Sequence, residues 1–246
     1  MMKIFGIILS ISFFLANDAY TIIKNMQDKD LSKSVKTTFS MRTMNQKGKI
    51  KKLDFTSWSK NEDNEQKQII WFTAPFSFKG ISFLKIQKND ATSMTMWHPK
   101  YKKIRKIPLR DKGNSFMNSE LTYEDLYIRN IDQFNYILIK EGNINQEDCY
   151  IIESTPNKKL DSNYSKHRTW ISKEKLIPIR ETSYNLNGIL YKEKSFYYNK
   201  ENKVDSIKIE NLEKGRYTVL SIKTIDSKED IKNNVFTERN LKRIPE

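Results

Sequence analysis

The stretch GISFLKIQKNDATSMTMWHPKYKKIRKI, residues 80–107, decides the fold class because apolar and polar residues alternate along it. Residues 80–87, 92–99 and 102–107 each have the period of two that is typical of a half-buried strand. The connections between these runs are short and polar, whereas parallel strands need crossovers of a dozen or more residues. The stretch therefore predicts three antiparallel strands.

The same alternation continues along most of the chain on both sides of this stretch. Further strands are predicted at residues 34–45, 50–58, 67–74, 133–140, 148–154, 166–172, 176–185, 188–198, 204–212 and 216–224. A last strand is expected at residues 234–244, a short helix at residues 20–34 and a helical turn at residues 227–234. A sheet of this many strands must curl or close, and with so few helices to fill it we expect an apolar cavity.

The composition allows one domain with a real core and gives it a strong positive charge. The 246 residues are 37% hydrophobic and 12% aromatic, which argues against disorder. The formal net charge of +14 would suit nucleic acid, an anionic membrane or an acidic partner. A general compositional bias towards Lys, Asn and Ile explains most of this charge.

The N-terminus predicts export. One cation, Lys3, precedes an apolar run from Ile4 to Ala16, which is too short to span a bilayer core of about 30 Å. We expect residues 1–19 to be a cleaved signal peptide and residues 20–246 to form a single domain. The alternative is a buried N-terminal helix or strand. Export makes a nucleic-acid partner improbable, and the absence of Cys after the run predicts no lipid anchor.

Motifs for metal, cofactor or nucleophilic chemistry are missing from the sequence. It has no H-E-x-x-H, C-x-x-C, G-x-S-x-G or phosphate-binding loop, so no catalytic residue, metal or cofactor is predicted. Cys149 is expected to be a small buried strand residue, His98 a strand-end residue and His167 an exposed one.

Two neighbouring segments leave their roles open. Glu120, Glu124 and Asp125 have the residue types of a glycosidase pair, but Thr122 to Asp125 also resembles a capping box, which we prefer. The basic run before them is either a solvated hairpin face or a docking surface for anionic headgroups or an acidic partner. The candidate docking residues are Lys100, Lys102, Lys103, Arg105 and Lys106.

About fifty residues resemble the LolA-like family of outer-membrane lipoprotein-sorting proteins. The ordered features are Pro75 with Lys79 and Gly80, Trp97 with Pro99, the strand Lys102–Ile107, and the signature Ser115–Leu126. Three positions depart from the family pattern, namely His98, Asn118 and Glu120. The resemblance implies a periplasmic, non-enzymatic carrier with a large curled antiparallel sheet, an incomplete β-barrel whose concave face is covered by a few short helices.

The resemblance also implies that lipoprotein or lipid acyl chains bind in the cavity. Candidate lining residues are Phe39, Met41, Leu53, Phe55, Trp71, Phe83, Met94 and Met96, and the candidate mouth residues are Phe76, Phe78, Phe116 and Met117. Each lining residue has plain core packing as its alternative. Transient contact with a membrane surface and an inner-membrane transporter as partner are further expectations.

Three functions remain open on these grounds. The first is a periplasmic carrier that transfers lipoprotein or lipid towards the outer membrane. The second is an interaction module that docks on an inner-membrane transporter through its basic hairpin. The third is a hydrolase that uses Glu120, Glu124 or Asp125.

Overall fold

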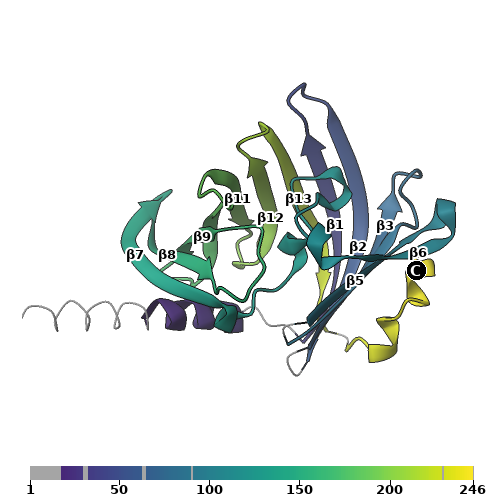
Figure 1. Ribbon diagram of the computed structural model, residues 1–246, viewed down its shortest axis with the longest axis horizontal. Coiled ribbons are helices and arrows are strands. Elements are labelled where there is room, and N and C mark those ends of the chain that lie inside the picture. The colour runs from purple at the N-terminus through teal and green to yellow at the C-terminus, as the bar shows by residue number, and fades with distance from the viewer. Residues whose placement is uncertain (1–17, 30–32, 63–64, 90, 229, 246) are drawn as a thin grey trace, which may run out of the picture. The chain divides into compact units, whose positions relative to one another are not determined.

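The computed structural model describes residues 18–29, 33–62, 65–89, 91–228 and 230–245, and over these the protein is almost entirely β (Figure 1). Thirteen strands form one antiparallel sheet in the order β6-β5-β4-β3-β2-β1-β13-β12-β11-β10-β9-β8-β7. The strands are β1 (Ser34–Met44), β2 (Ile50–Glu62), β3 (Glu65–Ala74), β4 (Ser82–Lys88), β5 (Ala91–His98), β6 (Lys103–Ile107), β7 (Phe134–Ile144), β8 (Glu147–Pro156), β9 (Lys166–Ser172), β10 (Pro178–Tyr184), β11 (Leu190–Tyr198), β12 (Val204–Asn211) and β13 (Arg216–Asp226).

The strand predictions are confirmed, with one exception near the C-terminus. Each of the thirteen strands overlaps a predicted run, because alternation and short polar turns are local signals. The last predicted strand, 234–244, is wrong: the chain there forms short 3-10 turns at Asn233–Val235 and Asn240–Lys242. The sheet begins at β6 and ends at β7, so it is not a closed barrel.

The first of two compact units combines residues 18–29 with Arg129–Tyr197, and we call it the helix unit. Residues 18–29 are helical, and Ala19 and Ile23 pack on Phe134 and Ile152 of the sheet. Of the predicted signal peptide only residues 18 and 19 lie among the described residues. No helix in the described part of the chain has the length and apolar character needed to cross a bilayer.

The second unit takes in residues 33–128 and those from Tyr198 onward, and we call it the aromatic unit. Both faces of its central strands are covered. One face carries an aromatic and methionine cluster closed by residues 112–128. The other carries Trp71, Ile69 and Leu84, packed under the C-terminal segment with Ile231 and Phe236.

Burial on both faces explains the sequence of β3. Ile69 to Phe72 form an unbroken apolar run, as expected for a strand that is covered on each side. Trp71 donates a 2.9 Å hydrogen bond from Nε1 to the carbonyl oxygen of Asn240, and Lys242 lies over the ring of Trp97. The C-terminal segment therefore acts as a layer of the core.

Candidate functional site

The apolar cluster on one face of the aromatic unit is built by cross-strand pairs. Phe39 on β1 pairs with Phe55 on β2, and Phe55 pairs with Phe72 on β3, with ring centroids 4.9 and 5.2 Å apart. Phe83 on β4 pairs with Met96 on β5. Directly opposed residues point to the same side of a sheet, so the register brings these side chains onto one face. The result is a broad surface of aromatic rings and thioethers.

A segment of chain, residues 112–128, covers this cluster, and we call it the closing segment. It contains two single 3-10 turns, Phe116–Asn118 and Glu124–Leu126, and Ser115 forms an isolated bridge with Thr122. The ring of Phe116 lies 5.0 Å from that of Phe83 and 5.9 Å from that of Phe72. The closing segment therefore places an aromatic side chain in the middle of the cluster.

Side chains from the sheet hold the closing segment through its backbone carbonyls. Lys51 Nζ donates to Met117 O at 3.1 Å, and Gln87 Nε2 donates to Ile128 O at 2.7 Å. Lys85 Nζ donates to Leu126 O and, at 2.6 Å, to Gln66 Oε1. All these attachments are hydrogen bonds between polar groups, which water can replace.

Lys85 is unusual because its ammonium group is buried. Its residue is 3% exposed, and desolvation lowers the pKa of Lys85 from 10.5 to about 7. Burial also lowers the pKa of Lys51. The two lysines that hold the closing segment thus carry their charge at a cost, which weakens the attachment relative to one made by a solvated lysine.

The structure brings together seven of the eight predicted lining residues. Phe39, Met41, Leu53, Phe55, Phe83, Met94 and Met96 all belong to the apolar cluster. The grouping was wrong for Trp71, which lies on the opposite face of the sheet, because Ile70 and Phe72 take the inward phase of β3. Whether the seven bind an acyl chain stays a prediction.

The four predicted mouth residues lie in three different environments. Phe116 is 1% exposed at the centre of the cluster, so it does not line an opening. Phe78 and Met117 lie at the edge of the cluster, and Lys51 Nζ is 4.2 Å from the centroid of the Phe78 ring. Phe76 is 92% exposed at the tip of the β3–β4 turn.

The basic run does not form one surface. Lys100 and Lys102 lie in the turn between β5 and β6, while Lys103, Arg105 and Lys106 lie on β6. Successive residues of a strand point to opposite faces, so Arg105 and Lys106 point apart. Charges on β6 also protect the exposed edge of the sheet from pairing with another chain. Docking of this run on a transporter stays a prediction.

Asp125 and Glu120, two acidic residues of the closing segment, have side-chain partners in the structure. Asp125 Oδ2 accepts hydrogen bonds from Thr122 N at 2.8 Å and Thr122 Oγ1 at 2.9 Å, and Asp125 N donates back to Thr122 Oγ1. The reciprocal hydrogen bonds of the predicted capping box are therefore present, but Tyr123 and not Thr122 is the N-cap residue of the 3-10 turn that follows. Glu120 Oε1 lies 2.7 Å from Arg216 Nε.

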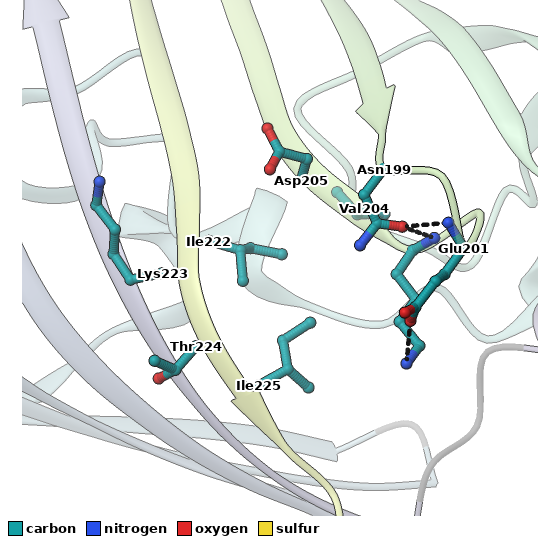
Figure 2. A pocket seen from close by; sticks show the side chains of 9 residues that line it. Asn199, Glu201, Val204, Asp205, Ile222, Lys223, Thr224 and Ile225 are labelled. Atoms are coloured by element: carbon teal, nitrogen blue, oxygen red, sulfur yellow. Dashed lines mark hydrogen bonds and ion pairs between the residues drawn. The ribbon is translucent and has the colours of Figure 1, made fainter.

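An open pocket of about 250 Å³ lies at one end of the cluster face (Figure 2). Figure 2 shows Ile222 and Ile225 of β13 pointing towards the turn that carries Asn199 and Glu201. Ile222 pairs with Phe39, so its side chain lies on the same face as the cluster. The pocket is thus a mostly polar hollow beside the cluster, to which Val204, Ile222 and Ile225 contribute apolar side chains.

The helix unit contains a buried polar network that the sequence analysis missed. Arg129 binds Glu181 through two hydrogen bonds, of 2.5 and 2.9 Å, and Lys194 Nζ lies 3.4 Å from Glu181 Oε1. Burial by itself would raise the pKa of Glu181, but the charges of Arg129 and Lys194 hold it well below its usual range. Glu181 pairs with Lys194 across β10 and β11, so opposite charges in phase on adjacent strands were the available signal.

The expectation that His167 is exposed was wrong, since it is 1% exposed within this network. Its Nδ1 lies 2.8 Å from Ser183 Oγ and 3.3 Å from Arg129 Nη2. A guanidinium only donates, so Nδ1 accepts and the ring proton is assigned to Nε2. A Ser-His-acid relay needs serine and acid on different ring nitrogens, whereas here Ser183 and Glu181 both face Nδ1.

Cys149 and His98 lie where the sequence analysis expects them. Cys149 is buried on β8 and His98 is the last residue of β5. Among the described residues, no group of three or more His, Cys, Asp or Glu side chains is arranged to hold a metal ion.

The sequence and the fold were compared with those of other proteins. The model of a family described as "Uncharacterized protein" matches residues 64–243. No curated protein matches the sequence.

Three solved structures share the fold over nearly their whole length. A DUF1329 family protein from Desulfovibrio piger has a TM-score of 0.87 at 24% identity, covering 92% of this chain and 99% of its own. A protein from Vibrio parahaemolyticus assigned to outer-membrane lipoprotein sorting has a TM-score of 0.86 at 22% identity, covering 93% and 100%. A LolA superfamily protein from Nitrosomonas europaea has a TM-score of 0.74 at 18% identity, covering 90% and 98%.

Proposed function

The chain belongs to the family whose model, described as "Uncharacterized protein", matches residues 64–243, and it has the fold of a LolA superfamily protein. From this fold we propose that it is a carrier of lipoprotein or lipid acyl chains. It binds the hydrocarbon on the cluster face of the aromatic unit, in the periplasm, and releases it towards the outer membrane. It performs no covalent chemistry on its cargo. The lipoprotein-sorting assignment of a structural neighbour supports the class of cargo.

The observation that carries this proposal is an apolar face covered by a segment that has little regular structure and is held by hydrogen bonds, one ion pair and the packing of Phe116. Phe55, Phe83 and Met94 offer rings and a thioether to a flexible chain, and methionine adapts to irregular shapes. The closing segment inserts Phe116 where an acyl chain would lie. Loading then replaces the Phe116 ring with the acyl chain on the cluster face.

The energies involved suit a reversible carrier. Burial of an acyl chain contributes about 0.8 kcal/mol per CH₂, so a chain of ordinary length outweighs the burial of one phenylalanine, about 3 kcal/mol. The backbone carbonyls of Met117, Leu126 and Ile128 become solvated when their lysine and glutamine donors release them. The pocket beside Ile222 has a mostly polar lining, so an acyl chain would start at the apolar cluster itself and not there.

Uptake of a fluorescent fatty-acid probe by delipidated protein tests the proposal. Met96→Glu puts a charge at the half-buried edge of the cluster and should weaken probe binding at least about tenfold, because a buried charge is expensive. Ser93→Glu on the same strand is the matched control, since Ser93 is exposed and lies outside the cluster.

A second variant asks whether the closing segment occupies the binding site. Phe116→Ala should increase the rate of probe uptake, because the variant has no ring at this position for the probe to displace. Delipidated protein that takes up no probe, or equal uptake by wild type and Met96→Glu, would exclude the carrier. Mass spectrometry of lipids bound to gently purified protein identifies the cargo.

A further inference from the structure

Four turns of the aromatic unit gather at one end of its strands. Successive antiparallel strands reverse direction, so every second connection lies at the same end of the sheet. In the strand order of this sheet these are the connections β1–β2, β3–β4, β5–β6 and β12–β13 (Figure 1). We call them the turn rim. A side chain at Gly215 would lie 3.6 Å from Gln46, and one at Gly80 would lie 3.4 Å from Pro99, so neighbouring turns touch.

Each turn of the rim presents one large apolar side chain to solvent. Ile50 is 61% exposed, Phe76 92% and Tyr101 60%, and Leu212 is also exposed. Such exposure is common for single residues but needs an explanation when every turn of one rim repeats it. The four side chains lie on separate protruding tips, not in a continuous patch or pocket.

Lysines surround these apolar tips. The exposed cations of the four turns are Lys47, Lys49, Lys79, Lys100, Lys102 and Lys214, and the turns contain one acidic residue, Glu213. Lys103, at the start of β6, adds a further exposed charge. The rim therefore has a local excess of positive charge, since its four turns contain six exposed lysines and one acidic residue.

We propose that the turn rim docks on the surface of an anionic lipid bilayer, with the Phe76 side chain inserted among the headgroups. Amphipathic contact of this kind combines shallow apolar insertion with attraction of lysines to lipid phosphates. Aromatic side chains such as Tyr101 prefer the level of the headgroups. Separate tips suit a fluid surface, whereas a protein partner usually offers a pocket for a central anchor.

This docking rests on the proposed carrier function, because it would bring the carrier to the membrane from which it takes or to which it delivers its cargo. Lys51, next to the β1–β2 turn, holds the closing segment at Met117 and lies over the Phe78 ring. Docking of the rim therefore brings one end of the closing segment, and the edge of the apolar cluster, to the lipid surface. Anionic headgroups also compete for the Lys51 ammonium group, which favours release of the segment.

Co-sedimentation with vesicles tests the docking. Wild-type protein should bind vesicles of phosphatidylcholine and phosphatidylglycerol, and bind vesicles of phosphatidylcholine alone at least about tenfold less. Replacement of Lys100, Lys102 and Lys103 by Glu should lower affinity for the anionic vesicles at least about tenfold, and Phe76→Ser at least about fivefold. Lys158→Glu with Lys159→Glu, exposed positions in the helix unit, is the matched control and should bind as wild type.

Two results would overturn the inference: no binding to either vesicle, or rim variants that bind as tightly as wild type. Capture of an acidic protein without vesicle binding would also overturn it. Failure of the carrier function looks different. The triple lysine variant should still take up the fatty-acid probe in vesicle-free solution, while Met96→Glu should lose uptake and keep vesicle binding.

Discussion

The two units solve the same packing problem with opposite chemistry. On one face of the aromatic unit, adjacent strands oppose rings and methionines, and Phe72, Phe83 and Phe116 are nearly inaccessible. In the helix unit, adjacent strands oppose charges, with Glu181 against Lys194 and Ser183 against His167 and Lys192. A polar network is directional and tolerates little change, whereas an apolar face is adaptable. We infer that the helix unit is the more rigid of the two. The aromatic unit then supplies the apolar face on which, under the proposed function, an acyl chain replaces the closing segment.

The largest expected effect comes from breaking the network of the helix unit. Arg129→Met leaves the buried carboxylate of Glu181 without its main partner and should lower the free energy of unfolding by about 3–5 kcal/mol. Urea unfolding followed by circular dichroism measures this change. Arg168→Met is the control, since its ion pair with Glu153 is partly exposed and worth about 1 kcal/mol or less. Equal losses in the two variants would contradict the contrast between buried and surface pairs.

The next effect separates two phenylalanines of the aromatic unit. Phe116→Ala removes a ring from the centre of the cluster and should cost about 3 kcal/mol of unfolding free energy, the lower end for such changes because the closing segment can relax. Phe76→Ala should change it by about 0.5 kcal/mol or less, since the ring is exposed. Chemical denaturation of both variants checks the pair. A large loss for Phe76→Ala would show that its turn packs against something.

The buried lysine predicts a pH dependence. Lys85 has a folded-state pKa of about 7 against 10.5 when unfolded, so between these values the unfolded chain binds more protons. The stability of wild type relative to Lys85→Met should therefore rise with pH above 7, by up to about 1.4 kcal/mol per unit and by about 2 kcal/mol between pH 7 and 9. Below about pH 6, where Lys85 is protonated in both the folded and the unfolded chain, the difference should be constant. Denaturant midpoints of both proteins at roughly pH 6, 7 and 9 measure how this stability difference changes with pH.

Lys88→Met is the matched control for this series, because Lys88 is an exposed residue on the same strand. As a surface substitution, it should change the free energy of unfolding by about 0.5 kcal/mol or less. A flat difference for Lys85→Met would mean that its ammonium group is solvated in the folded protein.

The smallest effect concerns the opposite face of the aromatic unit. Trp71→Phe keeps the packing but removes the hydrogen bond to Asn240 O, and should cost about 1 kcal/mol. Limited proteolysis should then cut the C-terminal segment faster than in wild type. Trp170→Phe serves as control, since that ring is half-buried on β9 and stacks with Arg180.

The strands could be predicted because their signal is local, but the phase of β3 could not. Ile69 to Phe72 are all apolar, so alternation gives no reason to choose Phe72 over Trp71 as the inward residue. A register shift between Asp54 and Phe55 also moves the pairing of β2 with β3. Bulges of this kind leave little trace in a sequence.

The candidate site was predicted in part for the same reason. Seven of the residues predicted to line a cavity share one cluster because single alternating strands define their faces, as for Leu53 and Phe55 on β2, and their role in binding stays a prediction. The closing segment's burial of Phe116 and the position of His167 depend on contacts between residues far apart in the chain. Charged residues in phase on neighbouring strands, such as Glu181 and Lys194, gave a usable signal only once their pairing was known.

The C-terminal segment that shields Trp71 restricts how this protein can be labelled. Leu241 is buried, and Asn240 accepts a hydrogen bond from the sheet, so this end of the chain lies against the core. A fluorophore or purification tag attached there needs a long flexible spacer. Without one it will displace the segment from Trp71 and Trp97. The connection at Lys158 and Lys159 is the better attachment point, because both of these residues are exposed.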